Sequence, residues 1–193
     1  LLVISGLLVR SFIQLRNVDP GFDASRMLTA AVSLPSDGYA GTEARVRFFT
    51  EFQERVQAIP EVEAVAVIDR LPIREGGGNI DVSTPEVFMA DPESRSTAYQ
   101  RMVLPGYFQA MGIPLLAGRD VADTDVENSA QVMIVSKAMA EGLFPGEDPL
   151  GRILAMDSGA EEPLLREVIG VVGDVTTSNL AGDLGRTMYY PYR

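Results

Sequence analysis

The path of the chain is most tightly constrained between Arg101 and Asp120, in the sequence RMVLPGYFQAMGIPLLAGRD. Proline fixes the backbone angle φ and glycine adopts conformations that other residues avoid, so each proline and glycine here specifies a turn locally. The pattern predicts a short strand at Met102–Leu104, one helical turn at Tyr107–Met111 and a second extended run that ends at Gly118. None of these side chains is an obvious catalyst, so the stretch predicts architecture rather than chemistry.

The residue types that are missing limit the chemistry open to this chain. It has no histidine and no cysteine, which removes the usual imidazole general base, thiolate metal ligands and disulfides. Its net charge of -11, with scattered basic residues, argues against binding to a phosphate backbone. We therefore expect neither an enzyme nor a nucleic-acid-binding protein, and no cofactor.

The chain of 193 residues is long enough for two small lobes, and its apolar pattern indicates an α+β fold. Thr29–Leu34 and Val62–Ile68 are predicted strands on either side of a helix. Thr42 is expected to be the N-cap of that helix and Pro60 to end it, which completes a β-α-β unit with a right-handed crossover if the strands are parallel neighbours. The apolar face of the helix consists of Val46, Phe49, Phe52, Val56 and Ile59.

The first residues, Leu1–Leu15, are apolar almost without interruption until Arg10. A membrane span needs about 20 apolar residues, so this segment is too short to cross a bilayer by itself. Two interpretations stay open from the residues alone: the outer end of a transmembrane helix, or an amphipathic core helix. The turn-forming residues Val18–Asp23 then end the helix.

A glycine-rich segment interrupts the apolar pattern at Leu71–Gly78. Its consecutive glycines Gly76, Gly77 and Gly78 predict a hinge or mobile loop. A phosphate-binding loop would need Gly-Lys-Ser/Thr at the start of a helix, whereas Asn79–Asp81 follows here. The segment is therefore interpreted as a loop.

The second half of the chain predicts mainly strands. Thr84–Ser96 is polar and is expected to be a surface loop. Ser136 is expected to cap a short helix, Lys137–Phe144. Apolar runs predict strands at Val132–Val135, Arg152–Met156, Leu164–Val172 and Thr187–Tyr192.

The densest acidic cluster holds the weak candidates for a metal site, Asp120, Asp123 and Asp125. Calcium favours clustered carboxylates, but an EF-hand loop that starts at Asp123 would need Gly at 128 and Glu at 134. The chain has Asn128 and Ile134 there. A solvated acidic loop is the simpler interpretation.

Two pairs of residues are candidates for catalysis. Ser136 and Lys137 are neighbours at a helix start, where adjacent side chains point apart, so they do not make a Ser-Lys dyad. An enzyme would instead need a carboxylate pair such as Asp174 and Asp183 brought together in one cleft.

Motifs of turn and packing residues occur in a specific order over nearly the whole chain. They are Gly6–Ser11, Val18–Asp23, Pro105–Phe108, Gly112–Asp120, Phe144–Gly151, Val168–Val175 and Tyr189–Tyr192. In this order they resemble the MacB-type periplasmic core domain of the FtsX-like ABC transporter permease group. In particular they are similar to the acidobacterial duplicated orphan permeases (ADOP).

The resemblance implies a domain inserted between the first two transmembrane helices of a permease in the inner (cytoplasmic) membrane, on its periplasmic side. Residues 1–17 then become the outer end of the first transmembrane helix, which attaches the domain to the membrane. Residues 18–79 become a porter-like β-α-β lobe and residues 80–193 a β-rich, Sabre-like lobe. The implied partners are the rest of the permease and an ABC ATPase subunit that hydrolyses ATP separately. The implied function is mechanotransmission, which couples ATP-driven motion to export or to partner proteins.

In this setting the stretch from Arg101 to Asp120 leads the chain through the β-rich lobe. We expect Tyr107, Phe108 and Met111 to anchor a core, and Arg119 with Asp120 to fix the turn that follows. The structural motif as a whole consists of Pro105, Gly106, Tyr107, Phe108, Gly112, Pro114, Gly118, Arg119 and Asp120.

The chain also departs from the family pattern. A further β-α-β unit is expected after Tyr189–Tyr192, and a first lobe without it would have open sheet edges, which favour a homodimer. The alternative function is an extracytoplasmic ligand-binding or sensor module, with a pocket between the two lobes near Gly76–Gly78.

Overall fold

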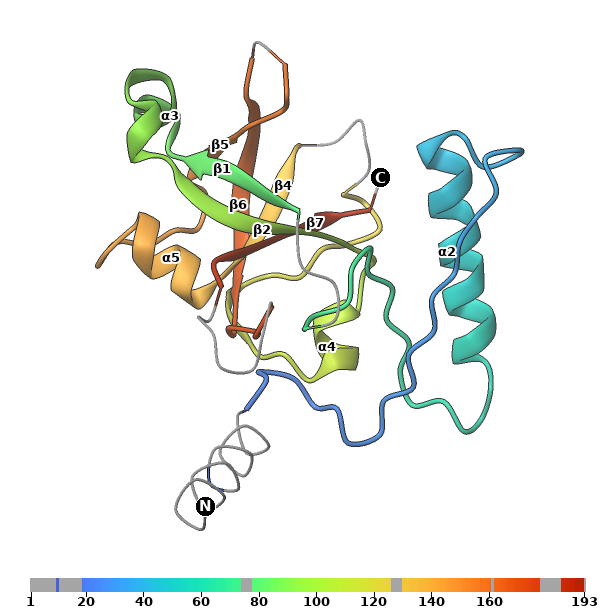
Figure 1. Ribbon diagram of the computed structural model, residues 1–193. Helices are drawn as coiled ribbons and strands as arrows, with labels where there is room; N and C mark the ends of the chain where they lie inside the picture. Colours follow the sequence, from blue (N-terminus) through green and yellow to red (C-terminus); the bar gives the residue numbers. More distant parts are fainter. Residues whose placement is uncertain are drawn as a thin grey trace, which may run out of the picture.

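The computed structural model describes Arg10 and residues 19–73, 78–125, 130–160, 162–177 and 185–192. It shows a mixed domain of helices and strands, which confirms the predicted α+β class (Figure 1). The predicted N-terminal helix, apart from Arg10, and the glycines Gly76 and Gly77 lie outside the described residues. Within the described part, no helix is both long and apolar enough to cross a membrane.

Strands dominate the chain from Asn79 onward. The strands are β1 (Asn79–Ser83), β2 (Ser96–Val103), β3 (Leu115–Gly118), β4 (Val132–Ser136), β5 (Ile153–Met156), β6 (Leu164–Val172) and β7 (Thr187–Pro191). The helices are α2 (Thr42–Gln57), α3 (Pro85–Ala90), α4 (Tyr107–Met111) and α5 (Lys137–Leu143), with a 3-10 turn η1 at Pro92–Ser94. The strands predicted in the second half of the chain are confirmed as β4, β5, β6 and β7. The Ser136 hydroxyl caps α5 as predicted, because it accepts the N–H of Met139.

All of these strands except β3 form a closed ring. The strand order is β3-β6-β4-β7-β2-β1-β5, and β5 also pairs with β6. The length of β6 allows both contacts, because Leu164–Glu167 pair with β5 while Gly170–Val172 pair with β3. The β2–β7 and β4–β6 pairs are parallel, and the others are antiparallel. Among the described strands, closure leaves β3 with a free edge.

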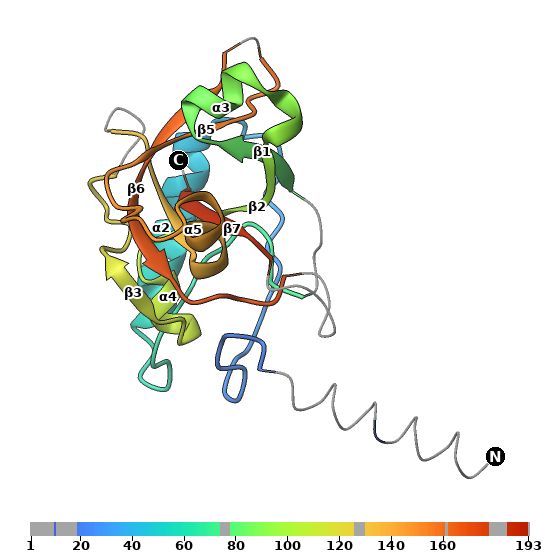
Figure 2. The same ribbon diagram turned by 90° about the vertical axis from the view of Figure 1, so that its left-hand side faces the viewer.

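One apolar core lies inside the ring and a second lies outside it. Successive residues of β4 show the division, because Met133 and Val135 belong to the first core and Ile134 to the second. The first core takes residues from every strand of the ring, and α5 adds Met139. In Figure 2 α5 lies in front of the ring, on the side that faces left in Figure 1. Helix α4 adds Tyr107 to the second core.

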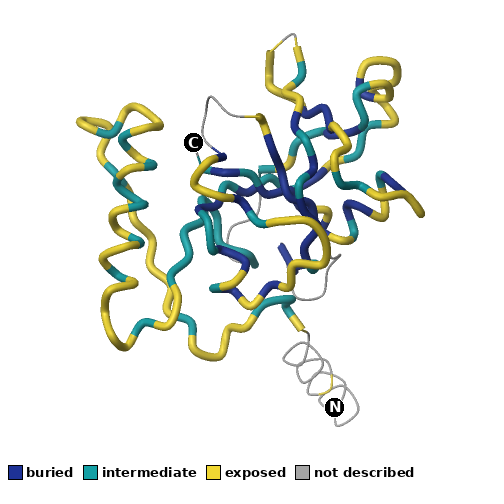
Figure 3. The backbone as a smooth tube through the Cα atoms, turned by 180° about the vertical axis from the view of Figure 1, so that it is seen from behind, coloured by how far each residue is buried: buried dark blue, intermediate teal, exposed yellow. Residues whose placement is uncertain are grey.

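Helix α2 stands apart from the closed ring of strands, which we call the barrel. It is the most exposed of the longer elements (Figures 1 and 3). None of its residues is buried. The predicted helix is confirmed, but its N-cap is Gly41 rather than Thr42, and no side chain caps it. It ends at Gln57, before Pro60. Its stability therefore rests on contacts at its surface rather than on a core.

The two strands predicted beside α2 do not form, which corrects the predicted β-α-β unit. Residues 29–34 and 62–67 have no ladder partner in the described part of the chain, and Ile68 makes an isolated bridge with Val103. A strand exists only when a neighbour completes its hydrogen bonds. After α2, carbonyls are instead bound by side chains of the helix, as where Gln57 Nε2 donates to the Glu63 carbonyl at 3.2 Å.

The segment predicted as a polar surface loop, Thr84–Ser96, contains α3 and η1 instead. Pro85 occupies the first turn of α3, where its missing N–H leaves no bond unmade. Phe88 is buried, and the Arg95 guanidinium lies 3.9 Å from the centre of its ring. A short helix with one buried aromatic residue gives too weak a period to be recognised among polar neighbours.

Candidate functional site

The segment Asp19–Asp23, which we call the N-terminal clamp, is fixed to two parts of the barrel domain. Thr176 donates its backbone N–H to the Pro20 carbonyl at 3.0 Å. Asp23 donates its N–H to the Met111 carbonyl, also at 3.0 Å. Because both bonds are made by the backbone, the attachment does not depend on the conformation of a long side chain.

Gly21 allows the N-terminal clamp to lie directly against the backbone at Asp174. Its φ of +81° is left-handed, and a Cβ at this position would lie 2.0 Å from the Asp174 carbonyl oxygen. Asp19 Oδ1 accepts the Gly21 N–H at 2.8 Å, which stabilises the turn. A side chain at this position would therefore push the clamp off the barrel.

An open cavity of about 450 Å³, with both polar and apolar lining, lies beside the clamp. It is lined by Asp19, Gly21, Phe22, Asp23, Gly112, Pro114, Gly173 and Asp174. Hydrogen bonds from the hydroxyl and N–H of Ser25 lower the pKa of Asp23, and Asp174 Oδ1 accepts the Ala138 N–H at 2.7 Å. Within the described residues, no group of acidic side chains is arranged to hold a metal ion.

Helix α2 is attached to the barrel by a few specific groups. Gln53 Nε2 donates to the Val65 carbonyl and to the Pro105 carbonyl, both at 3.1 Å. The rings of Phe49 and Tyr192 meet edge to face, with 5.8 Å between their centres. The amide of Gln53 thus joins the helix, the segment after it and the end of β2.

The segment 62–73, which we call the connector, leads from α2 back to the barrel. At its contact with β2, Asp69 donates its N–H to the Met102 carbonyl at 3.0 Å. Asp69 Oδ1 accepts the Met102 N–H in return, at 2.9 Å. We call this two-bond contact the Asp69 clasp.

The Asp69 clasp lies in a partly buried polar environment. Burial raises the pKa of Asp69, against the opposing effects of the Met102 N–H and of Arg70 and Arg101. The Arg101 side chain is 1% exposed and donates from Nη1 to the Gln100 carbonyl at 2.7 Å. Burial also raises the pKa of Tyr107 well above its ordinary value, so this phenol is neutral at any ordinary pH.

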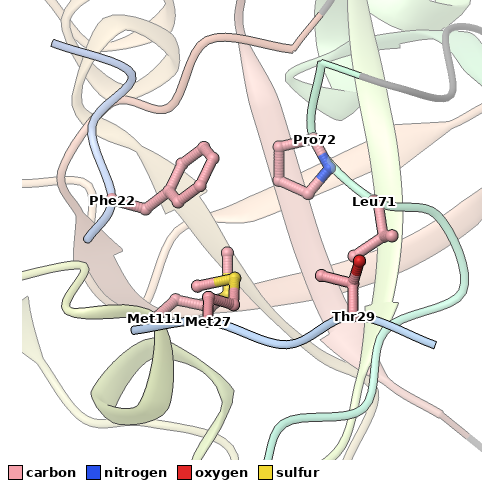
Figure 4. Close-up of a pocket in the computed structure, with 6 residues that line it drawn as sticks. All are labelled: Phe22, Met27, Thr29, Leu71, Pro72 and Met111. Carbon is pink, nitrogen blue, oxygen red and sulfur yellow. The ribbon is translucent and has the colours of Figure 1, made fainter. Parts of the chain in front are cut away.

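An apolar pocket of about 150 Å³ lies where the N-terminal segment, the connector and α4 meet. It is lined by Phe22, Met27, Thr29, Leu71, Pro72 and Met111. In Figure 4 Phe22 and Pro72 stand on opposite sides of the pocket, with Met27 and Met111 below them. Its volume suits a single ring or a short alkyl chain rather than a drug-sized molecule.

The structure places much of the stretch from Arg101 to Asp120 in the second core. Tyr107, Phe108 and Met111 are buried, and the rings of Phe108 and Tyr189 meet edge to face at 4.9 Å. Gly106 and Gly112 flank α4 in left-handed conformations. Pro114 lies at the open cavity beside the clamp, and Gly118 ends β3.

The acidic cluster after β3 is organised by an ion pair. Arg119 donates from both Nη atoms to Asp125, at 2.7 and 2.9 Å, and the Ala122 N–H reaches Asp125 Oδ2 at 2.8 Å. The hydrogen bond to Asp125 raises the pKa of Arg119. Asp120 Oδ1 accepts the Val121 N–H. Both Asp125 oxygens already accept hydrogen bonds. A structural role in this turn therefore accounts for the acidic cluster better than a calcium site does.

The remaining candidates have separate places in the fold. Gly78, the described member of the predicted hinge, accepts the N–H of Gln100 at 2.9 Å. Asp183 lies outside the described residues, so the carboxylate pair with Asp174 has no measured geometry. The hydroxyl of Ser136 serves as the cap of α5.

The attachment points of the connector and of α2 were missed by reasoning from sequence. Gln53 carried a signal that was not used, because it is a polar residue between Phe49 and Val56 on the apolar face of the helix. Asp69 carried none, because an isolated acidic residue after a predicted strand is a common surface feature. The N-terminal clamp was recognised as a turn, without its partners.

The fold and these contacts define a class of domain: a small β-barrel with an external helix, joined to its N-terminal segment by backbone bonds. The chain belongs to the MacB-like periplasmic core domain family, whose model matches residues 5–193. It is therefore a periplasmic domain of the MacB type.

Curated relatives match part of the chain. It is 31% identical over 86 residues to the macrolide export ATP-binding/permease protein MacB of Aggregatibacter actinomycetemcomitans. It is 34% identical over 87 residues to a probable syringafactin export ATP-binding/permease protein of Pseudomonas syringae pv. tomato. Each match covers 45% of this chain and 12% of the relative, so the chain spans a small part of their length.

Solved structures show weaker similarity. The periplasmic region of MacB from Actinobacillus actinomycetemcomitans has 19% identity and a TM-score of 0.48, covering 74% of this chain and 54% of that one. The extracellular domain of the ABC-type transporter YknZ from Gram-positive bacteria has 22% identity and a TM-score of 0.47, covering 74% and 61%.

Proposed function

We propose that this domain belongs to an ABC-type permease of the inner membrane and that it transmits ATP-driven motion by mechanotransmission. The supporting observation is the N-terminal clamp, whose backbone bonds at Pro20 and Asp23 join the start of the described chain to the barrel. The partners are the rest of the permease and an ABC ATPase domain or subunit, which hydrolyses ATP.

A stiff attachment is what transmission of motion requires. If residues 1–17 form the membrane-anchored end, a displacement there reaches Pro20 first. The clamp passes it to Met111 at the end of α4 and to Thr176 beyond the end of β6, both of which adjoin the second core. Because interiors are close-packed, the barrel then moves as a unit. Helix α2, with no buried residue, is held to it only by surface contacts among the described residues, such as Gln53 with Pro105.

The wider context is part of the same proposal. Residues 18–79 correspond to a porter-like lobe and residues 80–193 to a Sabre-like lobe. The names of the relatives refer to export of macrolides and of syringafactin, which supports export as the activity of the whole permease. A homodimer would use the free edge of β3. The narrower assignment to the ADOP permeases stays a prediction.

The test uses two glycines with the same backbone conformation. Gly21 and Gly38 have φ values of +81° and +85°, but a Cβ at Gly38 meets nothing within 4 Å. In the full-length permease with its ATPase, Gly21→Ala should lower the substrate exported per ATP hydrolysed at least tenfold, because the clamp is displaced. Gly38→Ala should leave this ratio unchanged, since alanine at a left-handed φ costs only about 1–2 kcal/mol at either position.

The melting temperature of both variants shows whether a loss of export reflects unfolding. An equal fall in export for the two variants would mean that strain, not the clamp, is responsible. Export at the wild-type ratio in a folded Gly21→Ala variant would refute mechanotransmission through the clamp.

A second candidate function is supported by the apolar pocket, which lies beside the connector, between the two proposed lobes. As a ligand-binding or sensor module, the domain would take a small apolar group there. Indole or toluene at a saturating concentration should then raise the melting temperature. Met111→Ala, which enlarges the pocket, should alter that rise, and an unchanged melting temperature with both probes would refute this function.

A further inference from the structure

Strand β1 leaves the end of β2 unpaired on one side. The register of β1 on β2 stops at Tyr99, and Gly78 accepts the next N–H, that of Gln100, so the backbone groups of β2 beyond Gln100 need other partners on this side. The connector supplies them, because Leu104 donates to the Val67 carbonyl at 3.1 Å and Asp69 donates to the Met102 carbonyl. The connector thus covers an exposed edge of the barrel.

The Asp69 clasp limits this cover to a single bridge. The Asp69 carboxylate takes the Met102 N–H, which another carbonyl would accept in a longer ladder. The ladder therefore consists of one pair, Ile68 with Val103. One bridge fixes the position of the connector on β2. The contact can still be reversed, because only a few hydrogen bonds of about 1 kcal/mol each must open.

The groups that face the clasp come from the surrounding elements. Arg70 lies on the connector itself, Arg101 on β2, Tyr107 on α4 and Tyr190 on β7. The two guanidinium groups attract the carboxylate, and the two phenols are neutral because burial raises the pKa of each. The carboxylate is therefore held by charge as well as by the Met102 N–H.

Within the described parts of the chain, few other contacts attach α2 to the barrel. They include the bond from Gln53 to the Pro105 carbonyl and the ring contact between Phe49 and Tyr192. Helix α2 has no buried residue that would keep it in place by itself. The position of α2 therefore depends on where the connector is bound.

We propose that the Asp69 clasp is a latch that sets the position of α2 against the barrel and that its release frees α2 while the barrel stays folded. As a property of this fold, the latch is independent of the proposed transmission of motion. Only its purpose, to let α2 move during a transport cycle, rests on that function.

Hydrogen exchange measured by mass spectrometry on the intact protein tests the latch. Asp69→Ala removes the acceptor and should speed exchange in Thr42–Gln57 and in the connector at least threefold, with β4 and β6 unchanged. Asp69→Asn keeps an Oδ1 acceptor and should stay closer to the wild type. Asp148→Ala is the matched control, because Asp148 Oδ1 also accepts a backbone N–H, that of Leu150 at 3.0 Å, but far from the connector in sequence.

Two results would overturn the latch: exchange in α2 that is the same in Asp69→Ala as in the wild type, or exchange in Asp69→Ala that is also faster in β4 and β6.

A second variant covers the case in which Asp69→Ala does not fold. Ile68 and Val103 form a pair whose Cα atoms lie about 4.5 Å apart in this type of bridge, within reach of a disulfide. The chain has no cysteine, so Ile68→Cys with Val103→Cys makes one defined crosslink.

Oxidation of this double variant should slow exchange in α2 below that of its reduced form. Equal exchange in the two forms would overturn the latch. Neither measurement involves export, so failure of the latch leaves the Gly21→Ala test of mechanotransmission unaffected.

Discussion

Gln53 donates to the carbonyl oxygen of Pro105 at 3.1 Å, which joins the middle of an exposed helix to the turn that follows β2. The same amide binds the Val65 carbonyl at 3.1 Å, so one side chain connects α2, the connector and the barrel. The contact explains why a polar residue lies on the apolar face of α2. Among the described residues, Gln53 is thus one of the α2 side chains, with Phe49, that contact the barrel directly.

Gln53→Ala should therefore weaken the attachment of α2. Two hydrogen bonds are lost, each worth about 0.5–1.5 kcal/mol, and the Pro105 carbonyl is left without this donor. We expect faster hydrogen exchange in Thr42–Gln57, with little change in the barrel strands. Gln57→Ala is the control, because the partners of its amide among the described residues are connector carbonyls, at Val62 and Glu63. Equal effects of the two substitutions would show that the bond to Pro105 contributes nothing special.

The buried Tyr107 and the partly buried Tyr190 should respond in opposite ways to loss of their hydroxyl groups. The Tyr107 hydroxyl is buried and has no hydrogen-bond partner within the described residues, whereas the Tyr190 hydroxyl donates to Gln100 Oε1 at 2.7 Å. An unsatisfied buried polar group costs about 1–3 kcal/mol, so Tyr107→Phe should keep or raise the free energy of unfolding. Tyr190→Phe should lower it by about 1 kcal/mol. Denaturant titration of both variants measures the difference, and a loss in Tyr107→Phe as large as in Tyr190→Phe would contradict this account.

The apolar runs in the sequence determined the strands that could be predicted. All five residues of β4 are buried, and β6 is apolar over most of its length, so each is recognised without its neighbours. Closure of the ring was not predictable, because it depends on β5 pairing with both β1 and β6. Such long-range pairing leaves no periodic signal in either segment. The prediction for residues 29–34 was wrong in the opposite direction. The apolar run indicated a strand, but no neighbouring strand pairs with it in the described part of the chain.

The candidate site was less predictable than the fold for a physical reason. Its contacts at Pro20, Val65 and Pro105 are made to backbone carbonyls, which every residue has and which no side-chain pattern identifies. The glycine at position 21 was recognisable as part of a turn. Its partner at Asp174 lies too far along the chain for any local rule to indicate it.

The stability contributed by Asp69 should depend on pH with a definite sign. Burial raises the pKa of Asp69 above its ordinary value of 3.8. The folded protein therefore takes up this proton at a higher pH than the unfolded chain, and folding gains stability as the pH falls through the raised pKa toward 3.8. Asp69→Asn cannot titrate, so the wild type should gain free energy of unfolding relative to Asp69→Asn between neutral pH and that range. Denaturant titrations across this range measure the gain.

Asp23 provides a control with the opposite sign. Hydrogen bonds from Ser25 lower the pKa of Asp23 below 3.8. Stability from this group is present above 3.8 and is lost as the pH falls through the lowered pKa. The wild type should thus lose free energy of unfolding relative to Asp23→Asn in acid. The same sign for both variants would contradict the assignment of these shifts to burial and to hydrogen bonding.

The pair Arg119 and Asp125 should behave as a structural ion pair rather than a calcium site. Arg119→Lys replaces two parallel bonds with one flexible contact and should lower the free energy of unfolding by about 1 kcal/mol, because the arginine is half exposed. Arg55→Lys, in the exposed pair with Glu51, should have no measurable effect. Addition of calcium to about 1 mM should leave the melting temperature unchanged. A rise that disappears in Asp123→Asn would instead establish a metal site.

The end of β3 should tolerate no side chain, although its backbone conformation alone would permit one at a moderate cost. Gly118 has a φ of +74°, and a Cβ there would lie 2.2 Å from the Ile169 carbonyl oxygen on β6. Gly151 has a φ of +75°, and a Cβ added there would have nothing within 4 Å. Gly151→Ala should therefore lose about 1–2 kcal/mol of unfolding free energy from its left-handed conformation alone. Gly118→Ala should lose clearly more, because β3 must also move away from β6. Denaturant titration separates the two effects, and equal losses would mean that β3 moves from β6 without cost.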